Sequence, residues 1–268
     1  MKLKIYSKEN KESGSIEMPN QFKEDIRTDI IKRAVEVIQA NRRQPYGADP
    51  RAGKKTSAEL SRKRRDYKTS YGHGISRVPR KILSGRGSRF NWVGAFAPGT
   101  VGGRRAHPPK AEKIWTKKIN TKERRKAIRS AMSATLIKEL VEKRGHKIPR
   151  NYPFIIDSSI ENLKKTEEVK KLLISLGFEE ELQRTSERKV RPGKGKIRGR
   201  RYKNKVGPLI VVSGPCDLHK SARNIQGINI RSVKSINAEL LAPGTVCGRL
   251  TLWTKSAIEK IEKENLFI

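Results

Sequence analysis

The chain has 268 residues and a formal net charge of +35, with 62 Lys and Arg against 27 Asp and Glu. Its two cysteines form no CxxC pair, which argues against a disulfide framework and indicates a reducing compartment. The longest apolar run, Leu209 to Val212, is far too short to span a bilayer, and residues 1–6 lack the apolar core of a secretion signal. We therefore expect a cytoplasmic protein with no membrane partner.

The first 41 residues predict two short strands and a helix. Strand-like pieces containing Leu3, Ile5 and Ile16 flank a turn at residues 11–14. Apolar residues from Phe22 to Ile38 then recur at the spacing of one helix face. This helix is expected to end near residue 41, because a proline and a glycine follow closely.

The next 72 residues, 42–113, contain no convincing amphipathic element. They hold 19 Lys and Arg against four acidic residues, a net charge of +15, together with ten Gly and six Pro. Such a polar segment buries too little apolar surface to offset the entropy lost on ordering. Loops longer than about 12–15 residues are usually functional or disordered. We predict an extended basic arm that takes shape on an acidic partner, with at most one short helix, at residues 57–67.

From residue 114 onward, helix and strand patterns alternate. Asn120 and Glu123 have the spacing of a capping box, and the helix that they open is expected to run to Arg144, where Gly145 ends it. The further expected elements are a strand at 154–156, a helix at 160–176, a buried strand at 209–213, short helical pieces near 221 and at 236–241, strands at 228–230 and 249–253, and a last helix capped by Thr254. This alternation predicts an α/β fold. Residues 1–41 and 114–268 would form a Rossmann-like three-layer body with a mostly parallel sheet flanked by helices.

A second basic segment, residues 183–205, interrupts this body as a predicted loop. It has eleven Lys and Arg against Glu187, so the arm and this segment carry +25 of the net +35 in 95 residues. Charge concentrated in two Gly-containing segments is typical of a nucleic-acid binder rather than of a uniformly solvated surface. A membrane surface would require a basic amphipathic helix, which neither segment provides.

The glycine-rich motifs that hold nucleotides are incomplete. Gly53-Lys54 and Gly193-Lys194 lack the other residues of a phosphate loop. Gly85-Arg86-Gly87 has Phe90 where a dinucleotide fingerprint needs its third glycine. We therefore predict no nucleotide cofactor.

No catalytic or metal-binding constellation is found either. The four histidines are scattered, with no second His and no Cys at ligand spacing. Cys216 lies near Asp217 and His219 and could be a nucleophile, although a small buried residue at a strand end is the commoner case. We predict no catalytic residue, no metal site and no cofactor.

RNA is the predicted partner of the two basic segments. Lys and Arg neutralise phosphates, and the aromatic residues among them can stack on unpaired bases. Alternatively, Phe90, Trp92 and Phe96 form a small core within the arm or contact an apolar neighbour in an assembly. The candidate RNA-binding residues are Arg42, Arg43, Arg51, Lys54, Lys55, Arg62, Arg64, Arg65, Arg77, Arg80, Arg86, Arg89, Arg104, Arg105, His107 and Lys110 in the arm, and Arg188, Lys189, Lys194, Lys196, Arg198, Arg200, Arg201 and Tyr202 in the second segment.

Several stretches, in order along nearly the whole chain, resemble one known family. They are Gly103 to Lys110 (GRRAHPPK), Asn120 to Thr135 (NTKERRKAIRSAMSAT), Gly193 to Tyr202 (GKGKIRGRRY), Ser221 to Asn224 (SARN) and Leu240 to Gly244 (LLAPG). Together they closely resemble the universal large-subunit ribosomal protein four family in its archaeal and eukaryotic form. The chain ends soon after its last helix, as in the archaeal members.

The resemblance implies a globular body on the large ribosomal subunit and a long loop that threads into ribosomal RNA. The tip of the loop would form part of the wall of the nascent-peptide exit tunnel. Residues 42–113 correspond to this loop and residues 72–96 to its tip, although Ser88 to Phe96 is more aromatic than the family pattern. The candidate tunnel-facing residues are Ile75, Arg77, Arg86, Arg89, Phe90 and Trp92.

The predicted function is therefore structural. The chain would bind ribosomal RNA, contact neighbouring large-subunit proteins and support subunit assembly. Two alternatives remain at the level of the sequence: an RNA-modifying enzyme with a Rossmann-like core, and a free-standing RNA chaperone.

Overall fold

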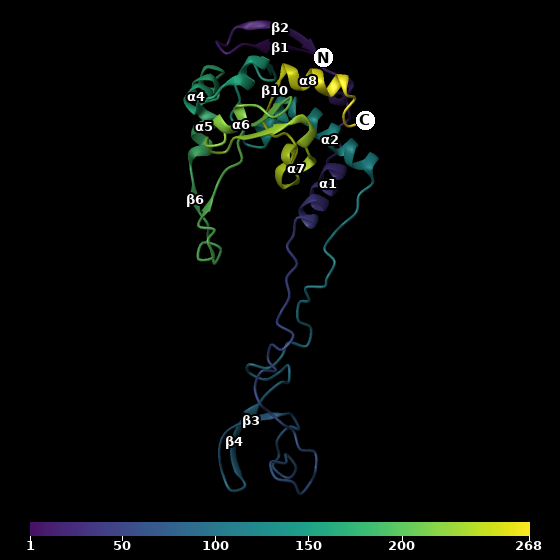
Figure 1. The fold of residues 1–268 in the computed structure, drawn as a ribbon, viewed down its shortest axis with the longest axis vertical. Coiled ribbons are helices and arrows are strands. Elements are labelled where there is room, and N and C mark those ends of the chain that lie inside the picture. The colour runs from purple at the N-terminus through teal and green to yellow at the C-terminus, as the bar shows by residue number, and fades with distance from the viewer. The chain divides into compact units, whose positions relative to one another are not determined.

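The protein is described by a computed structural model that covers residues 1–268. The chain divides into two compact units. The first, here called the body, consists of Met1–Arg42 and Thr116–Ile268, and the second, the arm unit, is Arg43–Trp115. Figure 1 shows the elements of both.

The body is built on a six-stranded sheet with the order β2-β1-β5-β10-β8-β9. Only β1 and β2 pair antiparallel, and the other neighbours are parallel. The strands are β1 (Lys2–Tyr6), β2 (Glu12–Glu17), β5 (Ile155–Ile156), β8 (Leu209–Val212), β9 (Asn229–Ser232) and β10 (Thr251–Thr254). The predicted α/β class with a mostly parallel sheet is confirmed. The strand order is not the 3-2-1-4-5-6 order of the Rossmann fold, so the resemblance to that fold does not extend to topology.

Helices pack against both faces of the sheet, because alternate strand residues are apolar on each side. Leu209 and Val211 of β8 belong to one core cluster, and Ile210 and Val212 belong to the other. A strand buried on both faces needs a continuous apolar run, which is what the sequence of β8 shows. The helices contributing to the first cluster are α1 (Thr28–Asn41), α2 (Thr121–Thr135), α7 (Ala238–Leu241) and α8 (Lys255–Lys263); those contributing to the second are α3 (Lys138–Lys143), α4 (Thr166–Ser175), α5 (Glu179–Ser186) and α6 (Leu218–Ser221). None of the helices has the length and apolar character needed to cross a bilayer.

Three expected helices are shorter than their apolar patterns suggest. The helix expected from Phe22 begins at Thr28, and Phe22 itself lies in a separate 3-10 turn. The helix expected over 160–176 divides into a 3-10 turn at Ser158–Asn162 and α4. The helix expected over 120–144 divides into α2 and α3, because the backbone of Ile137 is extended. The carbonyl of Thr135, where α2 ends, accepts a hydrogen bond from the buried Tyr152 hydroxyl.

The two predicted helix caps have opposite outcomes. The side chain of Asn120 makes no capping hydrogen bond, and Glu123 pairs with Arg33 instead (3.1 Å). The predicted capping box is therefore wrong, although the helix starts where it was expected. The Thr254 cap of α8 is confirmed, since its hydroxyl oxygen accepts a hydrogen bond from the backbone N–H of Ala257 (3.3 Å).

The arm unit contains one pair of regular strands, β3 (Arg80–Arg86) and β4 (Arg89–Gly94). They are joined by the two-residue turn Gly87-Ser88, and Gly87 has a φ of +58°, which glycine adopts at no steric cost. This hairpin is not among the expected elements. The short helix expected at 57–67 is absent, because that stretch forms only isolated bridges to Arg80 and Thr69.

Candidate nucleic-acid interface

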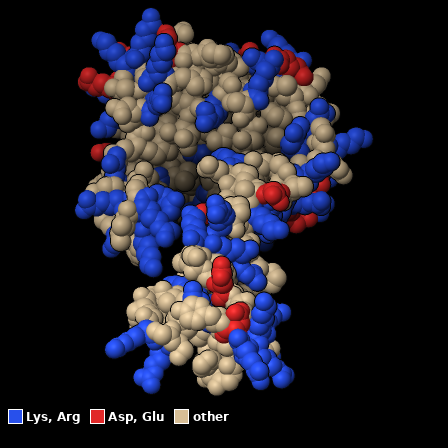
Figure 2. Space-filling model, turned by 60° about the horizontal axis from the view of Figure 1, so that its bottom comes forward, with Lys and Arg blue, Asp and Glu red and all other residues tan.

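Unpaired positive charge is the main feature of the predicted RNA-binding residues. Figure 2 shows Lys and Arg spread over much of the face in view, with few Asp and Glu among them. Among the predicted cations, Arg42 pairs with Glu239 (2.8 Å) and Lys55 pairs with Asp49 (2.6 Å); the others form no ion pair. Most of these cations are also exposed, so they are available to a polyanion.

The two ends of the arm unit lie side by side. The rings of Tyr46 and Trp115 stack, with centroids 5.9 Å apart, and the guanidinium of Arg43 lies 3.6 Å from the centre of the Trp115 ring. The N–H of Ala48 donates a hydrogen bond to the carbonyl of Pro109 (2.9 Å). Trp115 is not among the predicted site residues, since the expected arm ends at Lys113. The sequence feature that could have identified it is an aromatic residue among cations, two positions beyond that boundary.

Gly53 allows these two segments to approach closely. Its φ is +75°, and a Cβ built on it would collide with the backbone of Arg104. We expect Gly53→Ala to separate the segments and to speed proteolytic cleavage within residues 43–115 at least about fivefold, through a loss of local stability on the order of 1–3 kcal/mol. Limited proteolysis followed by mass spectrometry measures the rate.

The matched control for this variant is Gly102→Ala. Gly102 has nearly the same φ, +73°, but its Cβ would meet no atom within 4 Å. It therefore has the backbone strain without the collision. Equal cleavage of the two variants would show that the close approach at Gly53 does not hold the segments together.

The aromatic residues of the arm unit contact each other and their neighbouring cations. The Phe90 ring lies 5.3 Å from both Tyr67 and Trp92, and the Arg80 guanidinium lies 5.6 Å from the Trp92 centroid. Phe96 has no ring partner. The structure thus brings Phe90 and Trp92 together with Tyr67. This matches the predicted alternative of a small core within the arm, except that Tyr67 takes part and Phe96 does not.

The predicted tip residues differ in exposure. Arg86 and Arg89 are exposed on either side of the Gly87-Ser88 turn. Ile75, Phe90 and Trp92 are only partly exposed and line a shallow hollow of about 410 Å³. Arg77 is exposed, and its guanidinium lies 4.3 Å from the Tyr71 ring. The hairpin therefore presents cations at its turn and aromatic rings behind it.

The second basic segment forms a short hairpin stem with an exposed loop. Its strands are β6 (Lys189–Val190) and β7 (Tyr202–Lys203), extended by a hydrogen bond from the N–H of Arg191 to the carbonyl of Arg201 (2.8 Å). The predicted cations of the loop are all exposed: Lys194, Lys196, Arg198, Arg200 and Arg201. Residues 183–186 belong to α5, so the loop begins at residue 187 and not at 183. We call residues 187–205 the second basic loop.

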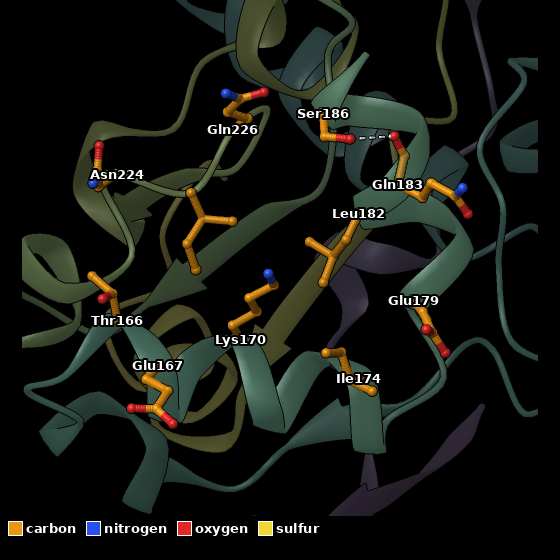
Figure 3. A pocket seen from close by; sticks show the side chains of 11 residues that line it. Thr166, Glu167, Lys170, Ile174, Glu179, Leu182, Gln183, Ser186, Asn224 and Gln226 are labelled. Carbon is orange, nitrogen blue, oxygen red and sulfur yellow. Dashed lines mark hydrogen bonds between the residues drawn. The ribbon is translucent and has the colours of Figure 1, made fainter.

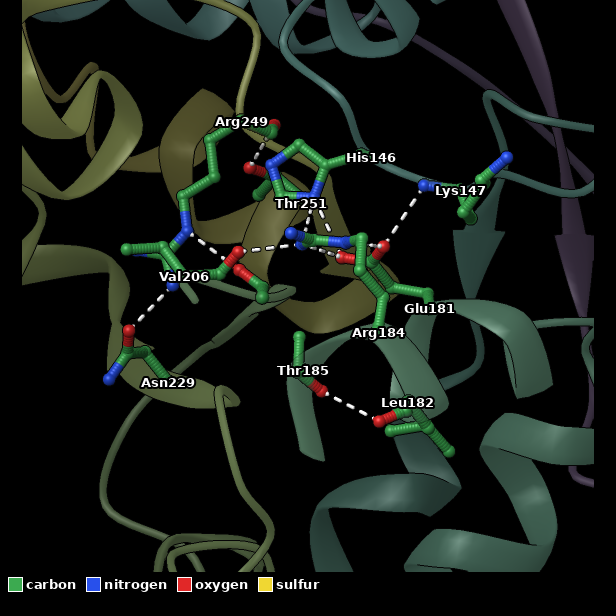
Figure 4. A network of polar contacts seen from close by, with 11 residues as sticks. His146, Lys147, Glu181, Leu182, Arg184, Thr185, Val206, Asn229, Arg249 and Thr251 are labelled. Atoms are coloured by element: carbon green, nitrogen blue, oxygen red, sulfur yellow. Dashed lines mark hydrogen bonds and ion pairs between the residues drawn. The ribbon is translucent and has the colours of Figure 1, made fainter. Parts of the chain in front are cut away.

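A buried polar network lies where this loop returns to the body (Figure 4). Glu181 is fully buried, and both of its oxygens accept hydrogen bonds from Arg184 (2.7 Å each). Arg184 also donates to the carbonyl of Val206 (2.8 Å). His146 Nδ1 lies 2.7 Å from Glu181 Oε1, and the Lys147 N–H donates to Glu181 Oε2 (2.9 Å). Arg184 is therefore engaged within the body rather than available to RNA.

A second arginine, Arg249, binds the backbone of Gly207, the residue that follows Val206. Arg249 is 1% exposed and donates hydrogen bonds to the carbonyls of Gly207 (3.0 Å) and Leu240 (2.9 Å) and to the side chain of Asn229 (2.5 Å). Burial, and then the nearby charge of Arg144, lower the pKa of Arg249 to about 10. It nevertheless stays charged at neutral pH. The buried Arg249 and the partly buried Arg184 thus fix residues 207 and 206, which no sequence motif indicated.

The carboxylate of this network stays ionised and its histidine stays neutral. Burial alone would raise the pKa of Glu181, but hydrogen bonds from Arg184 and His146 bring it below the ordinary value. Burial lowers the pKa of His146 despite the neighbouring carboxylate, and Arg184 and Arg144 add to this effect. The neutral imidazole donates its Nδ1–H to Glu181.

This arrangement predicts a loss of stability in acid. Because the folded-state pKa of His146 is lowered, the unfolded chain binds a proton that the folded chain refuses as the pH falls below about 6.5. The free energy of unfolding should fall with decreasing pH from there, with a slope of at most about 1.4 kcal/mol per pH unit from this residue. The lowered pKa of Glu181 adds a further loss of folding stability at lower pH, as the carboxylate becomes protonated.

Urea denaturation between pH 7 and pH 5 measures this slope. The variant His146→Asn, whose side-chain amide can still donate a hydrogen bond, should flatten it. An unchanged slope in this variant would contradict the assignment.

The residues suspected of enzyme chemistry have other surroundings. Cys216 Sγ lies 3.4 Å from His219 Nδ1, but burial raises the pKa of the thiol, so it is protonated at neutral pH. The carboxyl ends of β8 and β10, where α/β proteins often bind ligands, are filled by Glu161. Its carboxylate accepts hydrogen bonds from the Ser213 N–H (3.1 Å) and the Thr254 hydroxyl (2.8 Å).

Comparison with known proteins places these features in a family. Residues 16–264 match the model of the ribosomal protein L4/L1 family. The chain is 50% identical over 268 residues to the large ribosomal subunit protein uL4 of Nanoarchaeum equitans, covering all of both chains. It is 45% identical to the uL4 protein of Methanosphaera stadtmanae, covering 97% of this chain and 96% of that one. It is 43% identical to the uL4 protein of Archaeoglobus fulgidus, covering 97% of both.

Proposed function

Since this chain belongs to the ribosomal protein L4/L1 family, we propose that it is a structural component of the large ribosomal subunit that binds ribosomal RNA through the arm unit and the second basic loop. The predicted resemblance to the archaeal members of the universal protein four family is confirmed by relatives that match over the whole chain. The family consists of ribosomal proteins, so the prediction of a non-enzymatic protein is also confirmed.

The observation that carries the RNA-binding proposal is the set of unpaired cations on these two segments. Each Lys or Arg that meets a phosphate releases condensed counterions, so binding gains free energy and becomes strongly salt-dependent. Arg stacked on a ring, as Arg77 is on Tyr71, presents a flat surface on which an unpaired base can continue the stack. Phosphate contacts would provide most of the affinity, and stacking would favour folded over duplex RNA.

The hairpin β3–β4 supports a role for the arm unit in the wall of the nascent-peptide exit tunnel. Of the six candidate tunnel-facing residues, Arg86 and Arg89 flank the turn and are exposed. We assign these two to the tunnel lumen. Phe90 and Trp92 would instead hold the hairpin against Tyr67, and Ile75 would pack beside them. Cations at this position would meet the nascent peptide and the surrounding RNA phosphates together.

Within the subunit, the body would contact neighbouring proteins and the two basic segments would join distant parts of the RNA. Joining such segments favours the folded RNA and thereby supports assembly. The protein would be located in the cytoplasm, where large subunits take part in translation.

The salt dependence of binding tests the RNA-binding proposal. We expect the triple variant Arg62→Gln, Arg64→Gln, Arg65→Gln to reduce the slope of log affinity against log salt for large-subunit RNA by roughly 2–3, which corresponds to about 0.7–0.9 for each of three lost phosphate contacts. Filter binding of the purified protein to this RNA at several salt concentrations measures the slope.

The control removes three exposed cations outside both basic segments, with Lys2→Gln, Lys8→Gln and Lys23→Gln. The net charge falls equally, but the slope should change by much less. Equal effects of the two triple variants would indicate a general charge effect and would contradict the assignment. Equal affinity for an unrelated RNA at matched salt would favour a free-standing RNA chaperone.

A further inference from the structure

One segment of the body reverses the charge of the chain. Residues 157–187, which include α4 and α5, contain eight Asp and Glu against five Lys and Arg, a net −3 in a protein of +35. Glu181 is buried and paired with Arg184, and the remaining side chains of the segment still carry a net negative charge. Negative charge repels phosphates, so this part of the body is less suited to RNA than the basic segments are.

The same helices border an open groove (Figure 3). Its volume is about 800 Å³, and it lies between α4, α5 and residues 224–226. Three aliphatic side chains line it: Ile174, Leu182 and Ile225. Ile174 is 40% exposed, and the other two are only partly buried. The groove therefore offers apolar surface that the body itself does not cover.

The polar lining of the groove suits a positively charged peptide. Glu179 is exposed and forms no ion pair, and Glu167 pairs only with the exposed Lys171 (2.7 Å), an interaction that is weak in water. Lys170 is the single cation that lines the groove. The side-chain amides of Gln183 and Asn224 make no hydrogen bond within the protein, so they are free to pair with a peptide backbone.

We propose that this groove binds an extended Lys- and Arg-rich segment of a neighbouring protein in the large subunit. An aliphatic side chain of that segment would contact Ile174, Leu182 and Ile225, while its cations would meet Glu167 and Glu179. The inference rests on the proposed function, because it assumes that the chain lies in the subunit. It assigns to the groove a protein partner, in contrast to the RNA partner of the basic segments.

Site-specific photocrosslinking in assembled large subunits tests this proposal. A photoreactive benzoylphenylalanine replaces Gln183, which lines the groove, or the exposed Glu180, which does not. After irradiation, the subunits are digested with nuclease and protease, and crosslinked peptides are identified by mass spectrometry. We expect position 183 to crosslink to a net-positive peptide from another large-subunit protein and position 180 not to. A crosslink from 183 to RNA or to a second copy of this chain, or equal yields at both positions, would overturn the proposal.

Charge reversal provides the second readout. Glu179→Lys should lower the crosslinking yield from position 183 at least about tenfold, because like charges across an interface oppose binding. Glu180→Lys, on the same helix but outside the groove, should leave the yield unchanged. Co-sedimentation of each variant with the large subunit is measured in parallel. A protein that fails to co-sediment would contradict the proposed function, whereas one that co-sediments without the crosslink would contradict the groove alone.

Discussion

Deletion of residues 72–96 is expected to leave the body folded but to lower retention in the large subunit at high salt at least about tenfold. The deleted residues lie inside the arm unit, and none of them belongs to either core cluster of the body. They include Arg77, Arg80, Lys81, Arg86 and Arg89. Losing several phosphate contacts lowers the affinity at every salt concentration, so a high-salt wash that the wild type survives should release the more weakly held variant.

Two measurements separate folding from retention. Circular dichroism and urea denaturation report on the body, and gradient sedimentation after a high-salt wash reports on subunit association. A variant that keeps the hairpin but replaces these five cations with Gln is the matched control. If it is retained like the wild type, the shape of the hairpin matters more than its charge. If the deleted protein fails to fold, the arm unit is part of the core and the division into two units is wrong.

The elements that sequence patterns predicted well are those whose cause is local. The run Leu209–Val212 is apolar at every position, because both faces of β8 are covered. Within an α/β chain, such a run predicts a buried strand of the sheet. Thr254 is the last residue of the buried strand β10 and directly precedes a helical pattern, so its cap needs no distant partner. The two basic segments can likewise be predicted from the sequence, since charge and glycine content are properties of composition alone.

The misassigned elements depend on residues that are distant in sequence. The hydrogen bond from Tyr152 to the carbonyl of Thr135 accompanies a break in a helix whose apolar pattern continues. Arg33, on α1, is the partner of Glu123, which was expected to serve as a cap. The β3–β4 hairpin had a local signal, Gly87-Ser88 before the alternating residues Arg89 to Gly94, but the surrounding charge and glycine content obscured it.

The buried network was the least predictable part of the site. His146, Arg249 and the pair Glu181 and Arg184 of α5 come from three separate parts of the chain, and each is an ordinary polar residue in its own sequence context. Only the fold places them around residues 206 and 207, where the second basic loop ends. An arginine that is counted in the charge of a basic segment can therefore serve the body instead, as Arg184 does.

Glu181→Ala is expected to lower the free energy of unfolding by about 3–5 kcal/mol, because it removes a fully buried carboxylate and leaves the mostly buried guanidinium of Arg184 without its ion-pair partner. Glu181 is fully buried and accepts hydrogen bonds from Arg184 and the Lys147 N–H. The substitution would leave the Lys147 N–H without its acceptor and Arg184 with only the carbonyl of Val206, beside a neutral His146. Urea denaturation at neutral pH measures the loss.

The neighbouring Glu180 is the matched control, since it is exposed and forms no ion pair. Glu180→Ala should change the free energy of unfolding by no more than about 0.5 kcal/mol. A loss below about 1 kcal/mol for Glu181→Ala would show that water or rearranged side chains satisfy the network. With the full loss, Arg184 would also release the carbonyl of Val206. The second basic loop should then exchange its backbone amide hydrogens faster near residue 206, which connects the stability of the body to the placement of its RNA-binding loop.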